Sequence, residues 1–215
     1  MTSQPEIARY TVGEELANSL THGFGLLLAI AGLGGLMVVA GGMRETVSCL
    51  VYGLTLILVY ATSTLYHGVR LPHAKQLLRT LDHVAIFLLI AGTYTPFVLI
   101  ALRGAWGWSL FGVVWVLAAL GAMFELSAWR HARGVRVALY IAIGWVGLVA
   151  LKPLVAALPG PGLWLLFGGG VSYTAGVLFY VWRGLRYHHA VWHLFVLGGS
   201  VLQYFAVLYY VLPAR

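Results

Sequence analysis

Long runs of apolar residues, separated by short polar connections, cover almost the whole sequence. The runs are continuous rather than alternating and are about 20 residues long, the length of a helix that crosses a membrane. Seven such runs lie at residues 20–41, 47–66, 84–102, 106–124, 135–151, 162–182 and 190–212. The pattern therefore predicts an all-α membrane protein, a seven-helix transmembrane bundle over residues 20–212 that follows a polar, cytoplasmic segment at residues 1–19.

Composition supports this interpretation and excludes several others. Of the 215 residues, 61% are hydrophobic and only 9% are charged, whereas a soluble domain carries about 25% charged residues. The net charge of +7 does not indicate a nucleic-acid partner, because the basic residues are scattered singly through short loops. A single cysteine, Cys49, excludes an internal disulfide and a thiolate zinc site. We expect membrane lipids as the partners.

The loop charges predict how the bundle is oriented. With seven spans, the loops on one side hold nine of the 13 Lys and Arg residues, and those on the other side hold four. Short cytoplasmic loops are enriched in Lys and Arg. We therefore expect a multi-pass protein of the cell membrane with a cytoplasmic N-terminus and an external C-terminus. The membrane we expect is a bacterial inner membrane.

Histidines and one acid gather at the predicted cytoplasmic ends of the spans. His189 and His193 are four residues apart and share one helix face, so two imidazoles could reach one metal ion. Ser63 and His67 have the same spacing at the end of the second span. Asp82, the only aspartate, lies at the start of the third span. The simpler reading is a set of interfacial histidines and a solvated carboxylate.

This pattern suits zinc chemistry. Three neutral imidazoles leave a fourth zinc position for water, whose pKa zinc lowers to about 7. A nearby carboxylate can hold that water and move its proton, and Asp82 is the candidate. Ser63, about one turn deeper than His67, could donate a hydrogen bond to the substrate or the water.

A second polar stripe opens the first span. Glu15, Asn18 and His22 lie at positions i, i+3 and i+7 and share one helix face. Their role is open: Glu15 suits the first turn of a helix because of the helix dipole, and Asn18 and His22 could be packing residues between helices. Support of a metal site is an equal alternative.

Three motifs occur in order along the chain: Glu15-x2-Asn18-x3-His22, Ser63-x3-His67 with Asp82 downstream, and His189-x3-His193. In this combination the sequence resembles the hemolysin III branch of the progestin and adipoQ receptor (PAQR) family over nearly its whole length. The resemblance implies a seven-helix bundle with a cytoplasmic N-terminus. In the receptor members of the family, zinc is held by one histidine of the second helix and two of the seventh.

By motif match, the resemblance implies zinc ligands at His67, His189 and His193, with Asp82 near the metal water and Ser63 as the family serine. His188 directly precedes His189, so a shift of the ligand register by one residue is conceivable. His188 has no histidine four residues later, which favours His189.

The resemblance suggests a zinc-dependent hydrolase that cleaves a lipid amide or ester, such as a ceramide-like amide, at the cytoplasmic leaflet. A non-catalytic alternative is a regulator or sensor of membrane homeostasis with a structural zinc ion. A pore-forming cytolysin is a third, disfavoured because no amphipathic segment suggests insertion from a soluble form. Nothing in the sequence specifies the substrate or the oligomeric state.

Overall fold

The structure is a computed structural model that describes residues 10–213. Its helices are α1 (Val12–Val39), α2 (Met43–Gly68), α3 (Pro72–Pro96), α4 (Gly104–Leu126), α5 (Arg133–Trp145), α6 (Leu151–Ala157), α7 (Gly160–Val181) and α8 (His188–Ala206). Two π-helical segments extend α3 and α8, at Phe97–Leu102 and Val207–Val211. Two 3-10 segments lie at Ala128–His131, before α5, and at Val146–Ala150, between α5 and α6.

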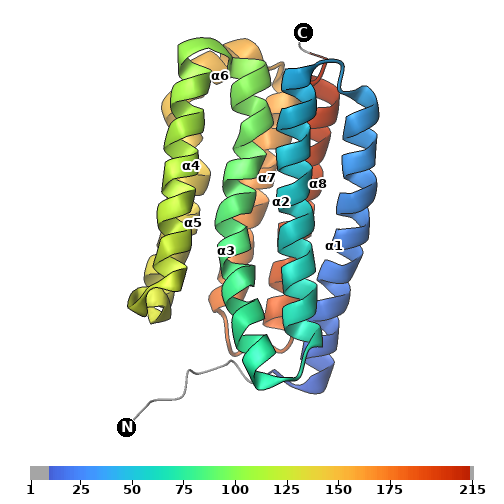
Figure 1. Cartoon of the computed structure of the whole chain (residues 1–215), viewed down its shortest axis with the longest axis vertical. Coiled ribbons are helices and arrows are strands. Elements are labelled where there is room, and N and C mark those ends of the chain that lie inside the picture. Colours follow the sequence, from blue (N-terminus) through green and yellow to red (C-terminus); the bar gives the residue numbers. More distant parts are fainter. Residues whose placement is uncertain (1–9, 214–215) are drawn as a thin grey trace.

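Seven helical stretches in the described part of the chain are long and apolar enough to cross a membrane. The π-helical extension joins α3 in one stretch, Pro72–Leu102, and α5 and α6 together form another, Arg133–Ala157. The stretches run up and down the bundle, so that α1 begins at the lower end in Figure 1 and α8 finishes at the upper end. This confirms the predicted all-α fold with seven spans.

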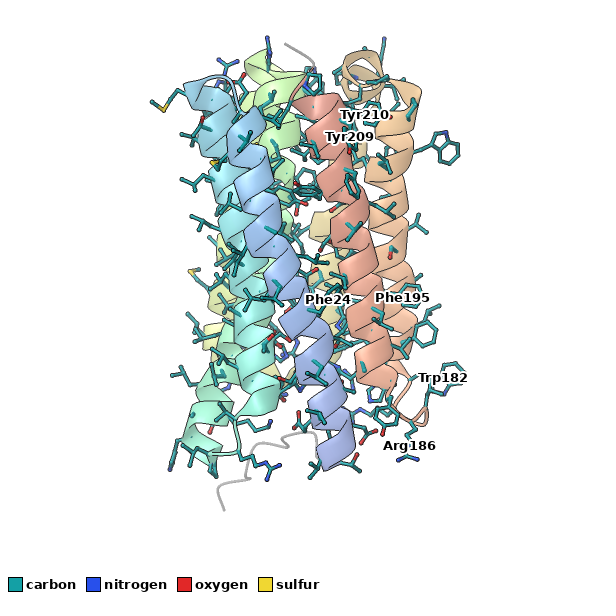
Figure 2. The ribbon with its side chains drawn as sticks, turned by 90° about the vertical axis from the view of Figure 1, so that its right-hand side faces the viewer. Phe24, Trp182, Arg186, Phe195, Tyr209 and Tyr210 are labelled. Atoms are coloured by element: carbon teal, nitrogen blue, oxygen red, sulfur yellow. The ribbon has the colours of Figure 1, made fainter. Side chains whose placement is uncertain are left out.

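The two ends of the bundle differ in charge. The end where α1 begins carries the connections and helix ends with Arg70, Lys75, Arg79, Arg130, Arg133, Arg136, Arg183 and Arg186. The opposite end carries Arg44, Arg103 and Lys152. We call the first the basic end, and Figure 2 places Trp182 and Arg186 there. That the basic end faces the cytoplasm stays a prediction from the positive-inside rule.

Several helices begin before the apolar runs do. Helix α1 begins at Val12, after a capping box in which the Thr11 hydroxyl accepts a hydrogen bond from the Glu14 backbone. Residues 12–19, expected in the polar segment, are therefore helical, whereas residues 1–9 lie outside the described residues. Helix α3 begins at Pro72, so Asp82 lies about three turns inside a helix rather than at its start. Charged first turns lower the hydropathy without ending a helix.

Small residues let the first helices pack closely. A Cβ atom at Gly92 of α3 would collide with Thr55 Oγ1 on α2, and one at Gly121 of α4 would collide with Phe87 Cε1 on α3. Helix α8 packs against both α1 and α7. The bundle thereby places the basic ends of α1, α2 and α8 next to one another. The three polar motifs of the sequence lie at these helix ends.

Candidate metal centre

Three histidines from two helices converge inside the basic end. His67 lies in the last turn of α2, and His189 and His193 lie in the first two turns of α8. One ring nitrogen of each lies within 4.8 Å of the others. The side chains of His67 and His193 are buried, and His189 has 9% of its surface exposed. Among the described His, Cys, Asp and Glu side chains, this group has the close spacing that a metal ion requires.

Helix α1 supplies hydrogen-bond partners that orient two of these rings. Glu15 Oε2 lies 2.6 Å from His67 Nδ1, and the Asn18 backbone oxygen lies 3.1 Å from His193 Nδ1. A carboxylate and a carbonyl only accept hydrogen bonds, so both rings carry their hydrogen on Nδ1 and keep a lone pair on Nε2. The 3.4 Å approach of Asn18 Nδ2 to His67 Nδ1 is then a packing contact.

Three further residues at this site carry no signal in the sequence pattern. Lys75 Nζ lies 2.8 Å from Glu15 Oε1, and Thr21 Oγ1 lies 3.1 Å from His193 Nδ1. The Tyr10 ring covers the histidines, with its centroid 6.0 Å from that of His67 and 5.3 Å from that of His189. Burial raises the pKa of the Tyr10 phenol above its ordinary value, so this hydroxyl is neutral at physiological pH.

A cavity of about 140 Å³ lies beside the histidines. Helices α1, α2, α3, α5, α7 and α8 all contribute to its wall. Ser63, Asp82, His189 and His193 line it together, so four of the residues predicted from the sequence share one cavity. His67 borders the same space through its ring contacts with His189 and His193, whose centroids lie 5.0 and 5.3 Å away.

The sequence matches the family described as Haemolysin-III related over residues 10–204. The chain belongs to this family. It is 46% identical over 205 residues to Hemolysin-3 of Bacillus cereus, covering 94% of each chain. It is 43% identical over 204 residues to a Hemolysin-3 homolog of Bacillus subtilis (strain 168), covering 94% of this chain and 96% of the relative.

A more distant relative comes from humans. The chain is 28% identical over 216 residues to the human Monocyte to macrophage differentiation factor, covering 96% of this chain and 89% of the relative. The family match and these relatives confirm the resemblance to hemolysin III proteins that the three sequence motifs indicated.

His188 and His83 are sequence neighbours of His189 and Asp82 in this Haemolysin-III-related chain. Both form contacts outside the group of three histidines. His188 Nδ1 lies 3.0 Å from the Phe179 carbonyl oxygen on α7, away from the group of three. His83 Nδ1 lies 3.2 Å from Glu125 Oε2 and 2.7 Å from Arg136 Nη1, in a buried charged cluster that joins α3, α4 and α5. The geometry thus favours His189 over His188 as the residue that faces His67.

Proposed function

We propose that the protein is a zinc-dependent hydrolase that cleaves the amide or ester bond of a membrane lipid at the cytoplasmic leaflet. The observation that carries this proposal is the convergence of three histidine nitrogens within 4.8 Å beside a cavity lined by Asp82 and Ser63. A set of metal ligands that shares a cavity with a carboxylate and a hydroxyl is what the activation of a water molecule needs.

His67, His189 and His193 have the chemistry of zinc ligands. His67 Nε2 and His189 Nδ1 are buried and have no hydrogen-bond partner within residues 10–213, so both atoms are available to a metal ion. A carboxylate or carbonyl on the outer nitrogen of a histidine, as at His67 and His193, fixes the metal-binding tautomer. When bound, zinc supplies a Lewis acid that makes water nucleophilic near neutral pH.

Asp82 and Ser63 act on the reacting atoms in this proposal. The Asp82 carboxylate accepts a proton from the attacking water and passes it to the leaving amine or alkoxide as the C–N or C–O bond breaks. Ser63 Oγ is buried, and its hydroxyl pairs with the Asp82 carboxyl group. When a substrate is bound, the same hydroxyl can rotate to donate to the carbonyl group or the water.

The cavity suits a substrate with a long apolar chain. Val59, Ile86 and Val196 are among the apolar residues that form most of its wall. A second space of about 70 Å³ shares lining residues with the first, and its wall extends along α3 and its π-helical extension to Leu102, toward the opposite end of the bundle. A lipid whose reactive bond lies at the basic end would thus place its chain along the bundle, in the leaflet that the loop charges assign to the cytoplasm.

Two other functions predict different results. A regulator with structural zinc would bind the metal and hydrolyse nothing. The name Hemolysin-3 of the Bacillus relatives suggests lysis of membranes, and a pore would release dye from loaded liposomes. The charge distribution disfavours a pore, because the buried His, Asp, Glu and Arg side chains of the described residues lie in the half of the bundle nearer the basic end.

Hydrolysis is tested with zinc-loaded protein in detergent, incubated with labelled ceramides and phospholipids. We expect the wild type and the exposed-site control His73→Ala to release fatty acid. Asp82→Asn should retain zinc and lose turnover by about 10²–10⁴-fold, the usual contribution of an acid–base group. Zinc-replete wild type that cleaves none of these lipids would refute the hydrolase in favour of the regulator.

A further inference from the structure

His22 of α1 is buried in the wall of the cavity, with 4% of its surface exposed. Its ring stacks on that of His193, with centroids 3.5 Å apart and 13° between the planes. It also stands edge-on to Tyr60, with centroids 5.1 Å apart. The His22 ring is therefore packed against two neighbouring rings, one nearly parallel to it and one nearly perpendicular. It lines the same cavity as Ser63 and Asp82.

Both ring nitrogens of His22 are buried and lack a hydrogen-bond partner within the described chain. In contrast, the Nδ1 atom has a hydrogen-bond partner in four other histidines, which are His67, His83, His188 and His193. A neutral imidazole has one donor and one acceptor, and leaving such a group unpaired in a buried site is costly. A molecule bound in the cavity could therefore supply the hydrogen-bond partner that the His22 ring lacks.

A metal ion held by the three histidines is not that partner. His22 does not belong to the group whose ligand atoms lie within 4.8 Å of one another. A metal ion lies in the plane of the imidazole that binds it, and the plane of His22 is nearly parallel to that of His193 at 3.5 Å. An ion in the plane of His193 cannot also lie in the plane of His22.

We propose that the N–H group of neutral His22 donates a hydrogen bond to the carbonyl oxygen of the lipid amide or ester. This inference rests on the proposed hydrolase function and deepens it. As the water oxygen adds to the carbonyl carbon, the C=O electron pair moves onto the carbonyl oxygen, and a donor held in place stabilises that charge. The charge returns to the carbonyl when the C–N or C–O bond breaks and the leaving group takes the proton from Asp82.

Two substitutions separate the donor from the ring. His22→Phe keeps an aromatic ring against His193 and removes the N–H group, whereas His22→Gln keeps an N–H donor and removes the ring. We expect His22→Phe to retain its zinc and to lower kcat for the labelled lipid by about 10²–10³-fold, the effect of losing one such donor. The kcat of His22→Gln should stay within about tenfold of the wild-type value. The exposed-site control His73→Phe should have the wild-type kcat.

Three results would overturn the assignment. Loss of zinc from His22→Phe would make His22 a support of the metal site. Full turnover by His22→Phe would mean that an ordered water alone occupies its nitrogens. Equal losses in His22→Phe and His22→Gln would mean that an N–H donor at this position does not restore turnover, against the assigned role.

A binding measurement keeps this inference separate from the hydrolase proposal. Tritiated palmitate carries a carboxylate that accepts the same hydrogen bond, and its equilibrium binding needs no turnover. We expect its Kd to rise about tenfold in His22→Phe and to stay at the wild-type value in His73→Phe. Equal Kd values in all three proteins would overturn the role of His22. Binding that depends on His22, without turnover of any lipid, would overturn only the hydrolase.

Discussion

Nδ1 of His67 on α2 lies 2.6 Å from Oε2 of Glu15 on α1, although 52 residues separate them in the chain. The other oxygen of the same carboxylate lies 2.8 Å from Lys75 Nζ near the start of α3. One carboxylate therefore ties three helices together and sets which nitrogen of His67 carries its hydrogen. This relationship gives the first motif of the sequence a physical role beside the candidate metal ligands.

Glu15→Gln tests that role. The amide oxygen can still accept a hydrogen bond but carries no charge, so the bond to His67 Nδ1–H weakens and the ion pair with Lys75 is lost. We expect zinc affinity to fall by about 10–100-fold, the usual effect of losing such a partner. Competition with a zinc chelator measures it. Glu45→Gln, in the first turn of α2 at the opposite end of the bundle, is the matched control, and an equal affinity in both variants would contradict the prediction.

The three histidines should determine the metal content. We expect the wild type to bind zinc stoichiometrically, whereas His67→Ala and His193→Ala each lose most of it, because two imidazoles form an incomplete site. Metal analysis of purified protein gives the answer, with the exposed His73→Ala as the control. If all four proteins contain the same amount of zinc, the metal centre is not where the geometry indicates.

Tyr10 should slow the exchange of the metal. Its ring lies over His67, His188 and His189, and Tyr10→Ala would open that side of the site. We expect a chelator to remove zinc several-fold faster from Tyr10→Ala than from wild type. Because burial raises the pKa of the phenol, Tyr10 remains neutral at neutral and mildly alkaline pH. Tyr10→Phe should therefore lose zinc at the wild-type rate. Faster loss of zinc from Tyr10→Phe would show that the hydroxyl itself is needed.

The buried charged cluster of α3, α4 and α5 should matter for stability. Glu125 Oε2 lies 3.0 Å from Arg136 Nη1, and the two side chains are 2% and 3% exposed. Glu125→Ala leaves Arg136 buried without its counter-ion, which costs about 3–5 kcal/mol, so the Tm in detergent should fall. Glu125→Leu combined with Arg136→Met removes both charges and should recover most of that loss. A double variant as unstable as the single one would contradict this account.

Some features of this protein follow from local sequence. A membrane span needs about 20 apolar residues in a row, so seven runs predicted seven spans without any knowledge of packing. Helical periodicity placed His189 and His193 on one face, and the Lys and Arg residues of the short loops marked one end of the bundle. The three motifs together indicated the family that the comparisons confirm.

Tertiary structure decided the rest. Hydropathy did not predict that α3 starts at Pro72 or that Asp82 lies inside that helix. The first turns of α3 are charged, and charged turns can be helical without being apolar. The rotation of each helix is set by its neighbours, not by its own pattern. Only packing could therefore show that Glu15 faces His67 and that Asn18 acts on His193 through its backbone oxygen. The same holds for His22, which lies flat on His193 with no partner for either ring nitrogen among residues 10–213.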